Sequence, residues 1–218
     1  MRENTAARRA DGRMKMAAPT ARSNSSPRGD ANPFGSIEMF VGCMFSGKTS
    51  ALLRRLESVA DASAVTIKHV IDDRYGGDAV VTHNGRARAA RSVFRAKDIP
   101  PLIPSDLKAV GIDEAHFFDD AIVAIVEGLA RRGVDVVLTA LDRDRGGRPF
   151  AVVERLRRCA SSTLEMHAAC ARCGARATRT QRLTPIVDGR MVGGAESYEP
   201  RCAGCWRPPP ENAPSARA

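Results

Sequence analysis

The sequence predicts an α/β fold, a parallel sheet with helices on both faces, followed by a small C-terminal domain. Strand-length apolar runs alternate with segments whose apolar residues recur at helical spacing, which is typical of parallel sheets. A glycine-rich turn joins the first such run to the first helical segment. From about residue 164 the sequence pattern changes to short polar segments that carry two Cys-x-x-Cys pairs. The chain therefore divides into an α/β core and a smaller cysteine-bearing unit.

The chain length of 218 residues allows one ordinary domain and a small appendage. Hydrophobic residues make up 43% of the chain, which predicts a packed core rather than disorder. We expect four segments: a disordered basic tail (1–34), the α/β core (35–163), the cysteine-bearing domain (164–206) and a disordered proline-rich tail (207–218).

The formal net charge of +9 favours anionic partners, either nucleotides or nucleic acid. Part of this charge lies in residues 1–34, where seven Lys/Arg stand against three Asp/Glu. This segment has too little apolar surface to fold, so we interpret it as a solubilising tail, with weak nucleic-acid binding as the alternative. No apolar run approaches the roughly 20 residues that span a bilayer, and the N-terminus lacks the apolar core of a secretory signal. We therefore expect a cytoplasmic protein.

Four strand-length apolar runs are expected to form the sheet. The first, IEMFV, is broken by a single Glu, and the last, VDVVLTAL, is rich in β-branched residues. The two between them read AVTIKHVI and KAVGI. In chain order these strands cover residues 37–41, 64–71, 108–112 and 134–141.

Three segments are expected to be helices. The first holds four apolar residues at helical spacing, and the second stops before Gly133, a plausible C′ residue. Residues 72–88 contain three glycines among charged residues and are expected to form a mobile loop. The expected helices cover residues 49–60, 119–132 and 150–159.

The turn GCMFSGKT fits the pattern G-x-x-x-x-G-K-[ST] and stands between an expected strand and an expected helix. Its glycines let backbone N–H groups face phosphate oxygens, and the positive helix N-terminus adds to the attraction. Lys48 would reach the β- and γ-phosphates of ATP, and the Thr49 hydroxyl would bind Mg²⁺. The predicted ATP-binding residues are Gly42, Cys43, Met44, Phe45, Ser46, Gly47, Lys48, Thr49 and Ser50.

Two acids, Asp113 and Glu114, follow the third expected strand, at the edge where ligands bind in open α/β sheets. Asp113 would hold Mg²⁺, directly or through water, and Glu114 would act as a general base. The letters DEAH also label a class of helicases, but a helicase core needs two nucleotide-binding lobes. The chain is too short for a second lobe. The acids alone fit a motor, a kinase, or simply a solvated strand end.

The four paired cysteines provide thiolates at the local spacing of a tetrahedral zinc site. The 28 residues between the pairs exceed the usual ribbon gap of about 15–20 and fit a lid tied at both ends. A closed four-sulfur site would be structural, because it has no open position for chemistry. Disulfides are the alternative. The predicted zinc ligands are Cys170, Cys173, Cys202 and Cys205.

Several motifs, taken together, resemble the thymidine kinases found in animal cytosol, many bacteria and large DNA viruses. The resemblance covers roughly residues 37–206 and depends on the order and spacing of the motifs. They are GCMFSGKTS (42–50), DDRYGG (72–77), TH (82–83), GIDEAHFF (111–118), ALDRDRGGRPF (140–150), CARC (170–173), VGGAESYEPRC (192–202) and CAGC (202–205).

This resemblance implies transfer of the γ-phosphoryl group of ATP to the 5′-hydroxyl of thymidine or deoxyuridine, a reaction of pyrimidine nucleotide salvage. Glu114 matches the general base of the family, and Asp72 and Arg74 match residues near the reacting end. Arg74 would steady the phosphoryl charge. The resemblance also implies Mg²⁺ with ATP, a structural Zn²⁺, a P-loop fold with a zinc-binding lasso domain, and a homotetramer. A viral chain would work in the host cytoplasm.

The resemblance places the nucleoside base under a flexible lid, about residues 188–198, which binds largely through backbone atoms. Its glycines suit backbone contact and hinge motion. For the apolar members of the pocket, ordinary core packing is the alternative. The predicted nucleoside-binding residues are Met44, Asp72, Phe117, Leu141, Phe150, Thr180, Met191, Val192, Gly193 and Tyr198.

The sequence departs from the family pattern at three positions. Arg145 stands where the family usually has a Phe that packs on the nucleoside, and His116 replaces a Gln. Asn84 replaces an Asp in a loop expected near the acceptor. An arginine can lie flat on a pyrimidine, but it brings charge into a mostly apolar pocket. A different nucleoside kinase, or a degenerate, non-catalytic homologue, is therefore the alternative function.

Overall fold

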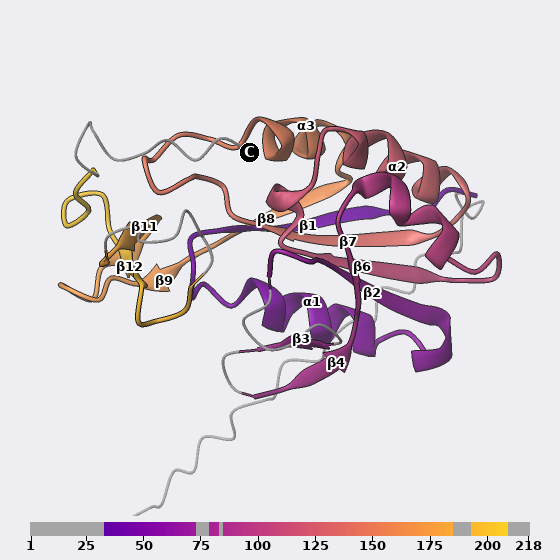
Figure 1. The fold of residues 1–218 in the computed structure, drawn as a ribbon, viewed down its shortest axis with the longest axis horizontal. Coiled ribbons are helices and arrows are strands. Elements are labelled where there is room, and N and C mark those ends of the chain that lie inside the picture. Colours follow the sequence, from indigo (N-terminus) through magenta and orange to yellow (C-terminus); the bar gives the residue numbers. More distant parts are fainter. Residues whose placement is uncertain (1–32, 73–78, 83–84, 185–192, 209–218) are drawn as a thin grey trace, which may run out of the picture. The chain divides into compact units, whose positions relative to one another are not determined.

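The computed structural model describes residues 33–72, 79–82, 85–184 and 193–208, and its main feature is a six-stranded sheet (Figure 1). The strands lie in the order β5, β2, β6, β7, β1, β8, and every neighbouring pair is parallel. The predicted α/β class with a parallel sheet is confirmed. The strands are β1 (Ile37–Gly42), β2 (Ala64–His69), β5 (Arg91–Val93), β6 (Ala109–Asp113), β7 (Asp135–Ala140) and β8 (Ser162–Met166).

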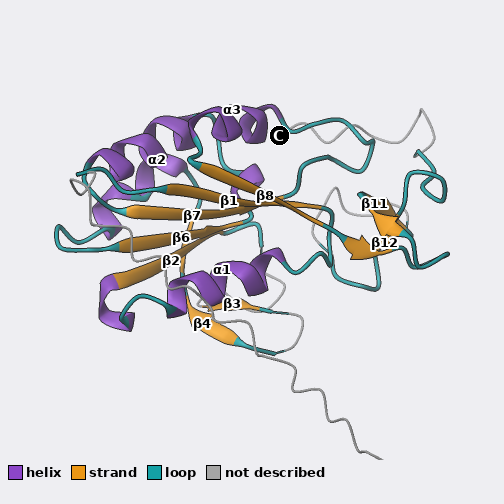
Figure 2. Ribbon diagram, turned by 180° about the vertical axis from the view of Figure 1, so that it is seen from behind, coloured by secondary structure: helices purple, strands orange, loops and turns teal. Residues whose placement is uncertain are grey.

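Helices cover both faces of this sheet (Figures 1 and 2). One face carries α1 (Lys48–Glu57), and the other carries α2 (Ala121–Arg131) and α3 (Ala151–Cys159). On the α1 face, Leu56 lies against β6, where a Cβ added to Gly111 would come within 2.5 Å of its Cδ1 atom. The glycine therefore allows α1 to approach the sheet closely, which fixes the direction of the turn that precedes the helix.

The expected elements are present, with shifted ends. The second strand stops at His69 rather than at residue 71, because Val70 and Ile71 turn out to solvent with 43% and 44% of their surface exposed. The first helix ends at Glu57 rather than at residue 60. At the end of α2, Gly133 has a φ of 80°, and its N–H donates to the Ala130 carbonyl, as a C′ glycine does.

The prediction of a mobile loop over residues 72–88 was wrong in part. An antiparallel hairpin of β3 (Ala79–Val81) and β4 (Ala87–Ala89) lies within it. Two strands of the main sheet were also missed: β5 is only three residues long, and β8 is mostly exposed at the sheet edge. Both are held by pairing with a buried neighbouring strand. Their own residues therefore need not follow a strand pattern, and the sequence does not reveal them.

The C-terminal part of the described chain consists of short antiparallel pairs. One joins β9 (Ala168–Ala169) to β10 (Arg176–Ala177), and the other joins β11 (Arg179–Arg182) to β12 (Tyr198–Arg201). Strand β8 runs to Met166 in the main sheet, past the boundary that the sequence suggested after residue 163. The small cysteine-bearing unit therefore follows directly after β8, an edge strand of the main sheet.

Candidate functional site

The glycine-rich turn lies between β1 and α1 at the carboxyl end of the sheet. A Cβ at Gly42 would lie 2.0 Å from the Met166 carbonyl oxygen, so no other residue fits beside β8. Gly47 has a φ of 84° and Phe45 a φ of 63°. A left-handed residue that is not glycine persists only when its surroundings hold it, so the turn has one enforced shape.

Lys48 lies along this turn rather than in solvent, with only 5% of its surface exposed. Its Nζ donates to the Cys43 carbonyl at 2.9 Å, and the Ser46 hydroxyl donates to the same carbonyl at 2.8 Å. The ammonium is thus fixed beside the backbone N–H groups of the turn. A cationic side chain and a curved backbone in this arrangement suit a polyphosphate.

The acid pair lies where β6 ends, next to the turn. Thr139 on β7 organises it: its hydroxyl donates to an oxygen of Asp113 and accepts the Glu114 N–H at 2.9 Å. Glu114 has a φ of 52° and a ψ of 47°. This left-handed conformation turns the chain sharply after the strand. Glu114 stays close enough for its charge to raise the pKa of Asp113, and its Oε2 atom lies 3.5 Å from His116 Nδ1.

Asp113 is well placed to bind a cation. Burial raises its pKa, the charges of Glu114 and Asp72 raise it further, and the Thr139 hydrogen bond and Lys48 oppose the rise, giving a value of about 7. The Thr49 hydroxyl lies 3.3 Å from the Asp113 carboxylate. Two hard oxygen ligands beside the glycine-rich turn of residues 42–49, called the phosphate turn below, fit Mg²⁺.

A partly open cavity lies beside the acid pair. It is bordered by Glu114 and by Met44 of the turn, so the acid and the phosphate turn face the same space. Seven of the ten predicted nucleoside-binding residues line it, which are Met44, Phe117, Leu141, Phe150, Thr180, Gly193 and Tyr198.

The other predicted site residues lie elsewhere or outside the described chain. Asp72 does not line the cavity; it is buried with 6% exposure at the end of β2, close enough to Asp113 to raise its pKa. Arg74, Met191 and Val192 fall outside the described residues.

His116 and the pair Arg143 and Asp144 also line the cavity, although the sequence did not single them out as site residues. The Leu141 N–H donates to His116 Nδ1 at 3.2 Å, and the imidazole lies 4.2 Å from the Phe117 ring, centroid to centroid. Its exchange for the family's Gln was visible in the sequence. The position of Arg143 and Asp144, directly after the fourth predicted strand, was the only signal for the other two.

Arg145, the residue that departs from the family pattern, is part of the same wall. On the opposite side, Arg182 fixes Tyr198, because its guanidinium donates to the phenol oxygen at 2.6 Å and lies 5.2 Å from the ring centroid. The cavity therefore combines aromatic surfaces with arginine side chains.

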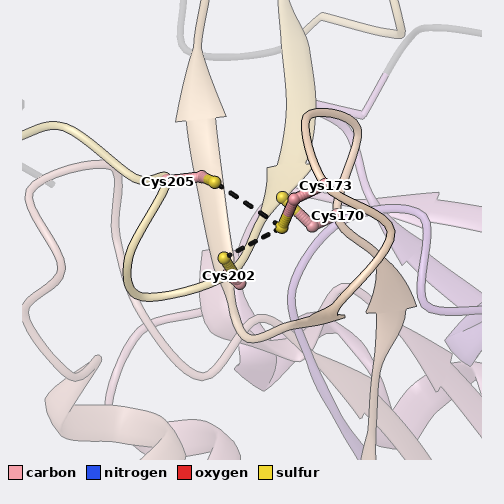
Figure 3. A group of neighbouring side chains, drawn as sticks. All are labelled: Cys170, Cys173, Cys202 and Cys205. Carbon is pink, nitrogen blue, oxygen red and sulfur yellow. Dashed lines mark hydrogen bonds between the residues drawn. The ribbon is translucent and has the colours of Figure 1, made fainter.

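The four paired cysteines come together as free thiols whose sulfur atoms all lie within 4.8 Å of one another (Figure 3). Cys173 Sγ lies 3.6 Å from the sulfur atoms of both Cys202 and Cys205. A tetrahedron of sulfur atoms around zinc, with arms of about 2.3 Å, has edges of about 3.8 Å. The cluster therefore has the size and chemistry of a four-thiolate metal site.

The protonation of these thiols agrees with that interpretation. Burial acts to raise the pKa of Cys170, but hydrogen bonds from the backbone N–H groups of Cys202, Arg172 and Cys173 outweigh it and bring the pKa to about 6. Hydrogen bonds with Cys173 and Cys202 raise the pKa of Cys205 to about 12. Four adjacent thiols cannot all ionise unless a cation offsets their charge.

None of the helices in the described parts of the chain is both long enough and apolar enough to cross a membrane. In a comparison with protein families, the family model described as thymidine kinase matches residues 35–206. The match spans the sheet, the phosphate turn, the acid pair and both cysteine pairs.

Proposed function

The chain belongs to the thymidine kinase family, and on that basis we propose that it transfers the γ-phosphoryl group of ATP to the 5′-hydroxyl of thymidine or deoxyuridine. The products would be the nucleoside monophosphate and ADP, formed in pyrimidine nucleotide salvage. One observation carries the proposal: Met44 of the phosphate turn and Glu114 border the same cavity. A phosphoryl donor held at the turn would therefore meet an acceptor held in the cavity.

The ATP site in this proposal is the turn from Gly42 to Ser50. Its N–H groups and Lys48 would hold the β- and γ-phosphates, since the ammonium is already fixed beside the backbone. Thr49 and Asp113 would hold Mg²⁺, which when bound offsets the negative charge of the phosphates. Arg74, outside the described residues, would steady the transferred group, because a guanidinium matches a phosphoryl group at two points.

Glu114 is the proposed general base. A base must lie within hydrogen-bond reach of the hydroxyl that it deprotonates, and Glu114 lines the cavity in which the sugar would lie. The hydrogen bond from its backbone N–H to Thr139 and its left-handed conformation hold this residue in place at the end of β6. Asp72 would act at the same end of the site.

The nucleoside would occupy the cavity, with its base against the aromatic rings of Phe117, Phe150 and Tyr198. The lid would supply backbone contacts from Met191, Val192 and Gly193. Its two ends would be tied by the cysteine cluster, for which we propose a structural Zn²⁺. A homotetramer is expected from the family resemblance, and size-exclusion chromatography with light scattering would test it.

A second function has specific support. Arg143 and Arg145 line the cavity, and charge of this kind changes which base edge is favoured. The chain would then be a kinase for another nucleoside, or a homologue that binds without turnover.

A competition assay separates these two functions. Purified protein with Mg²⁺ and ATP is offered thymidine, deoxyuridine and deoxycytidine together, and the monophosphates are quantified. The proposal expects thymidine and deoxyuridine monophosphates to dominate. Preferential phosphorylation of deoxycytidine would favour the second function, and nucleoside binding without any monophosphate would favour the degenerate homologue.

A further inference from the structure

We propose that Thr180 is a positioning residue for the phosphate turn, so that the cysteine-bearing unit sets the affinity of the core for nucleotide. Thr180 lies on β11, in the small unit, with 7% of its surface exposed. Its hydroxyl accepts the N–H of Met44 at 3.0 Å. This N–H belongs to the third residue of the turn, and it is therefore committed to the small unit rather than to phosphate.

A second contact joins the same step of the turn to the same unit. The Cys43 thiol donates to the Ala177 carbonyl at 3.4 Å. Cys43, Cys170 and Ala177 are each buried to 3% exposure or less and form one apolar cluster, against which Cys202 and Cys205 pack. The phosphate turn and the metal-type cysteine cluster thus share a small core.

The consequence follows from the strain in the turn. Phe45, directly after the anchored residue, has a left-handed backbone that needs outside support. Without the Thr180 anchor the turn would sample several conformations, and binding of a polyphosphate would have to reorder it. Only a fraction of the protein molecules would then have the turn in the conformation that binds nucleotide. The apparent dissociation constant would equal the intrinsic constant divided by that fraction, so binding would be weaker.

The inference rests on the proposed function only for the ligand of the turn, and binding of Mg²⁺·ADP without nucleoside tests it. Dissociation constants are measured by calorimetry for the wild type, Thr180→Val, which keeps the shape and removes the hydroxyl, and Thr180→Ser, which restores the hydroxyl. We expect about tenfold weaker binding for Thr180→Val and a value within about twofold of wild type for Thr180→Ser. The matched control is Thr163→Val, at an exposed threonine on β8, which should bind as wild type.

The outcomes distinguish failure of the proposed function from failure of the Thr180 inference alone. A wild-type protein that does not bind Mg²⁺·ADP would overturn the proposed function and the inference together. Equal Mg²⁺·ADP affinity in Thr180→Val would overturn the inference alone, as would a variant that loses only thymidine affinity, because Thr180 would then serve the nucleoside alone. The melting temperature and metal content of each variant show whether it is folded, so that a lower affinity for Mg²⁺·ADP can be distinguished from loss of folded protein.

A measurement without the Val substitution keeps the test decisive if that variant does not fold. Amide hydrogen exchange of Met44, followed by NMR in the nucleotide-free wild type, should be slowed well below the rate of an unprotected amide. It should stay slow in Thr180→Ser. Exchange of Met44 at the unprotected rate would show that the anchor does not form and would overturn the inference.

Discussion

Glu114, the proposed general base, has an unusual backbone conformation. It follows the last buried residue of β6 in a left-handed conformation, and its N–H is held by Thr139, a side chain of the neighbouring strand. Such strain at a functional position is maintained by the surrounding structure and aims one side chain. Here it turns the chain directly after Asp113, at the point where Glu114 lines the cavity.

Replacing Glu114 with Gln should leave the fold intact, because the side chain keeps its size and shape and loses only its charge and its ability to take up a proton. We expect kcat to fall by about 10²- to 10⁴-fold, since loss of a general base has effects of this order, with little change in the affinity for Mg²⁺·ATP. Steady-state kinetics and nucleotide titration measure the two quantities. Turnover close to wild type would remove Glu114 from the proposed mechanism.

The raised pKa of Asp113 leads to a pH-dependent stability. Its folded value of about 7 lies above the ordinary value of 3.8, so the folded chain holds this proton more tightly than the unfolded chain. The stabilisation is fully present below about pH 4 and is lost as the pH rises through about 7. We therefore expect the free energy of unfolding of nucleotide-free, Mg²⁺-free protein to decrease over this range because of Asp113.

Urea unfolding at a series of pH values measures this effect. Asp113→Asn provides the comparison, because its side chain has no titrating group and keeps a similar shape. The difference in unfolding free energy between the two proteins should change across the interval from about pH 4 to about pH 7. A difference that is constant with pH would show that the pKa of Asp113 is close to its ordinary value.

At the scale of elements, the cysteine cluster closes a loop of chain that carries part of the cavity wall. Gly193 and Tyr198 both line the cavity and both lie between the two cysteine pairs. Strands of two to four residues cannot hold such a segment by themselves, since they bury little surface. A metal bound by the four thiolates would contribute folding energy at this point.

Substitution of Cys205 with Ser tests this element. We expect metal analysis to give about one zinc per wild-type chain and well under one for Cys205→Ser, because a four-thiolate site loses one ligand. KM for thymidine should rise, since the cavity wall loses its tie. Cys159→Ser is the matched control: this half-buried cysteine at the end of α3 lies outside the cluster, and its variant should keep its zinc. Equal zinc content in both variants would contradict the site.

At the scale of the whole molecule, part of the positive net charge lies outside the residues that the family model matches. Residues 1–32 hold seven Lys/Arg against three Asp/Glu, whereas the family match begins at residue 35 and the first strand at Ile37. A variant without residues 1–32 should keep its melting temperature and kcat. Any binding to single-stranded DNA at low salt should disappear, because that binding would depend on the charge of the removed segment. Retained, salt-dependent binding, with ATPase activity stimulated by DNA, would instead place a nucleic-acid function in the core.

Much of the architecture could be read from local patterns. The runs that form β1, β2, β6 and β7 are apolar because both sides of a central parallel strand are buried. A strand of this kind is therefore visible in its own sequence. The phosphate turn was equally visible, because close approach of the backbone to β8 leaves room only for glycine at position 42. β5, β8 and the hairpin of β3 and β4 were not visible, since short edge strands are held by their partners.

The sequence by itself determined the class of the fold, the phosphate turn, the acid pair and the two cysteine pairs, because each is marked by a local periodicity or by a short motif. Only the tertiary structure decided which distant side chains meet. It brought His116, Arg143 and Asp144 to the cavity and placed Thr180 against Met44. Contacts across more than a hundred residues arise when separate elements pack, and no local pattern of residue types specifies them.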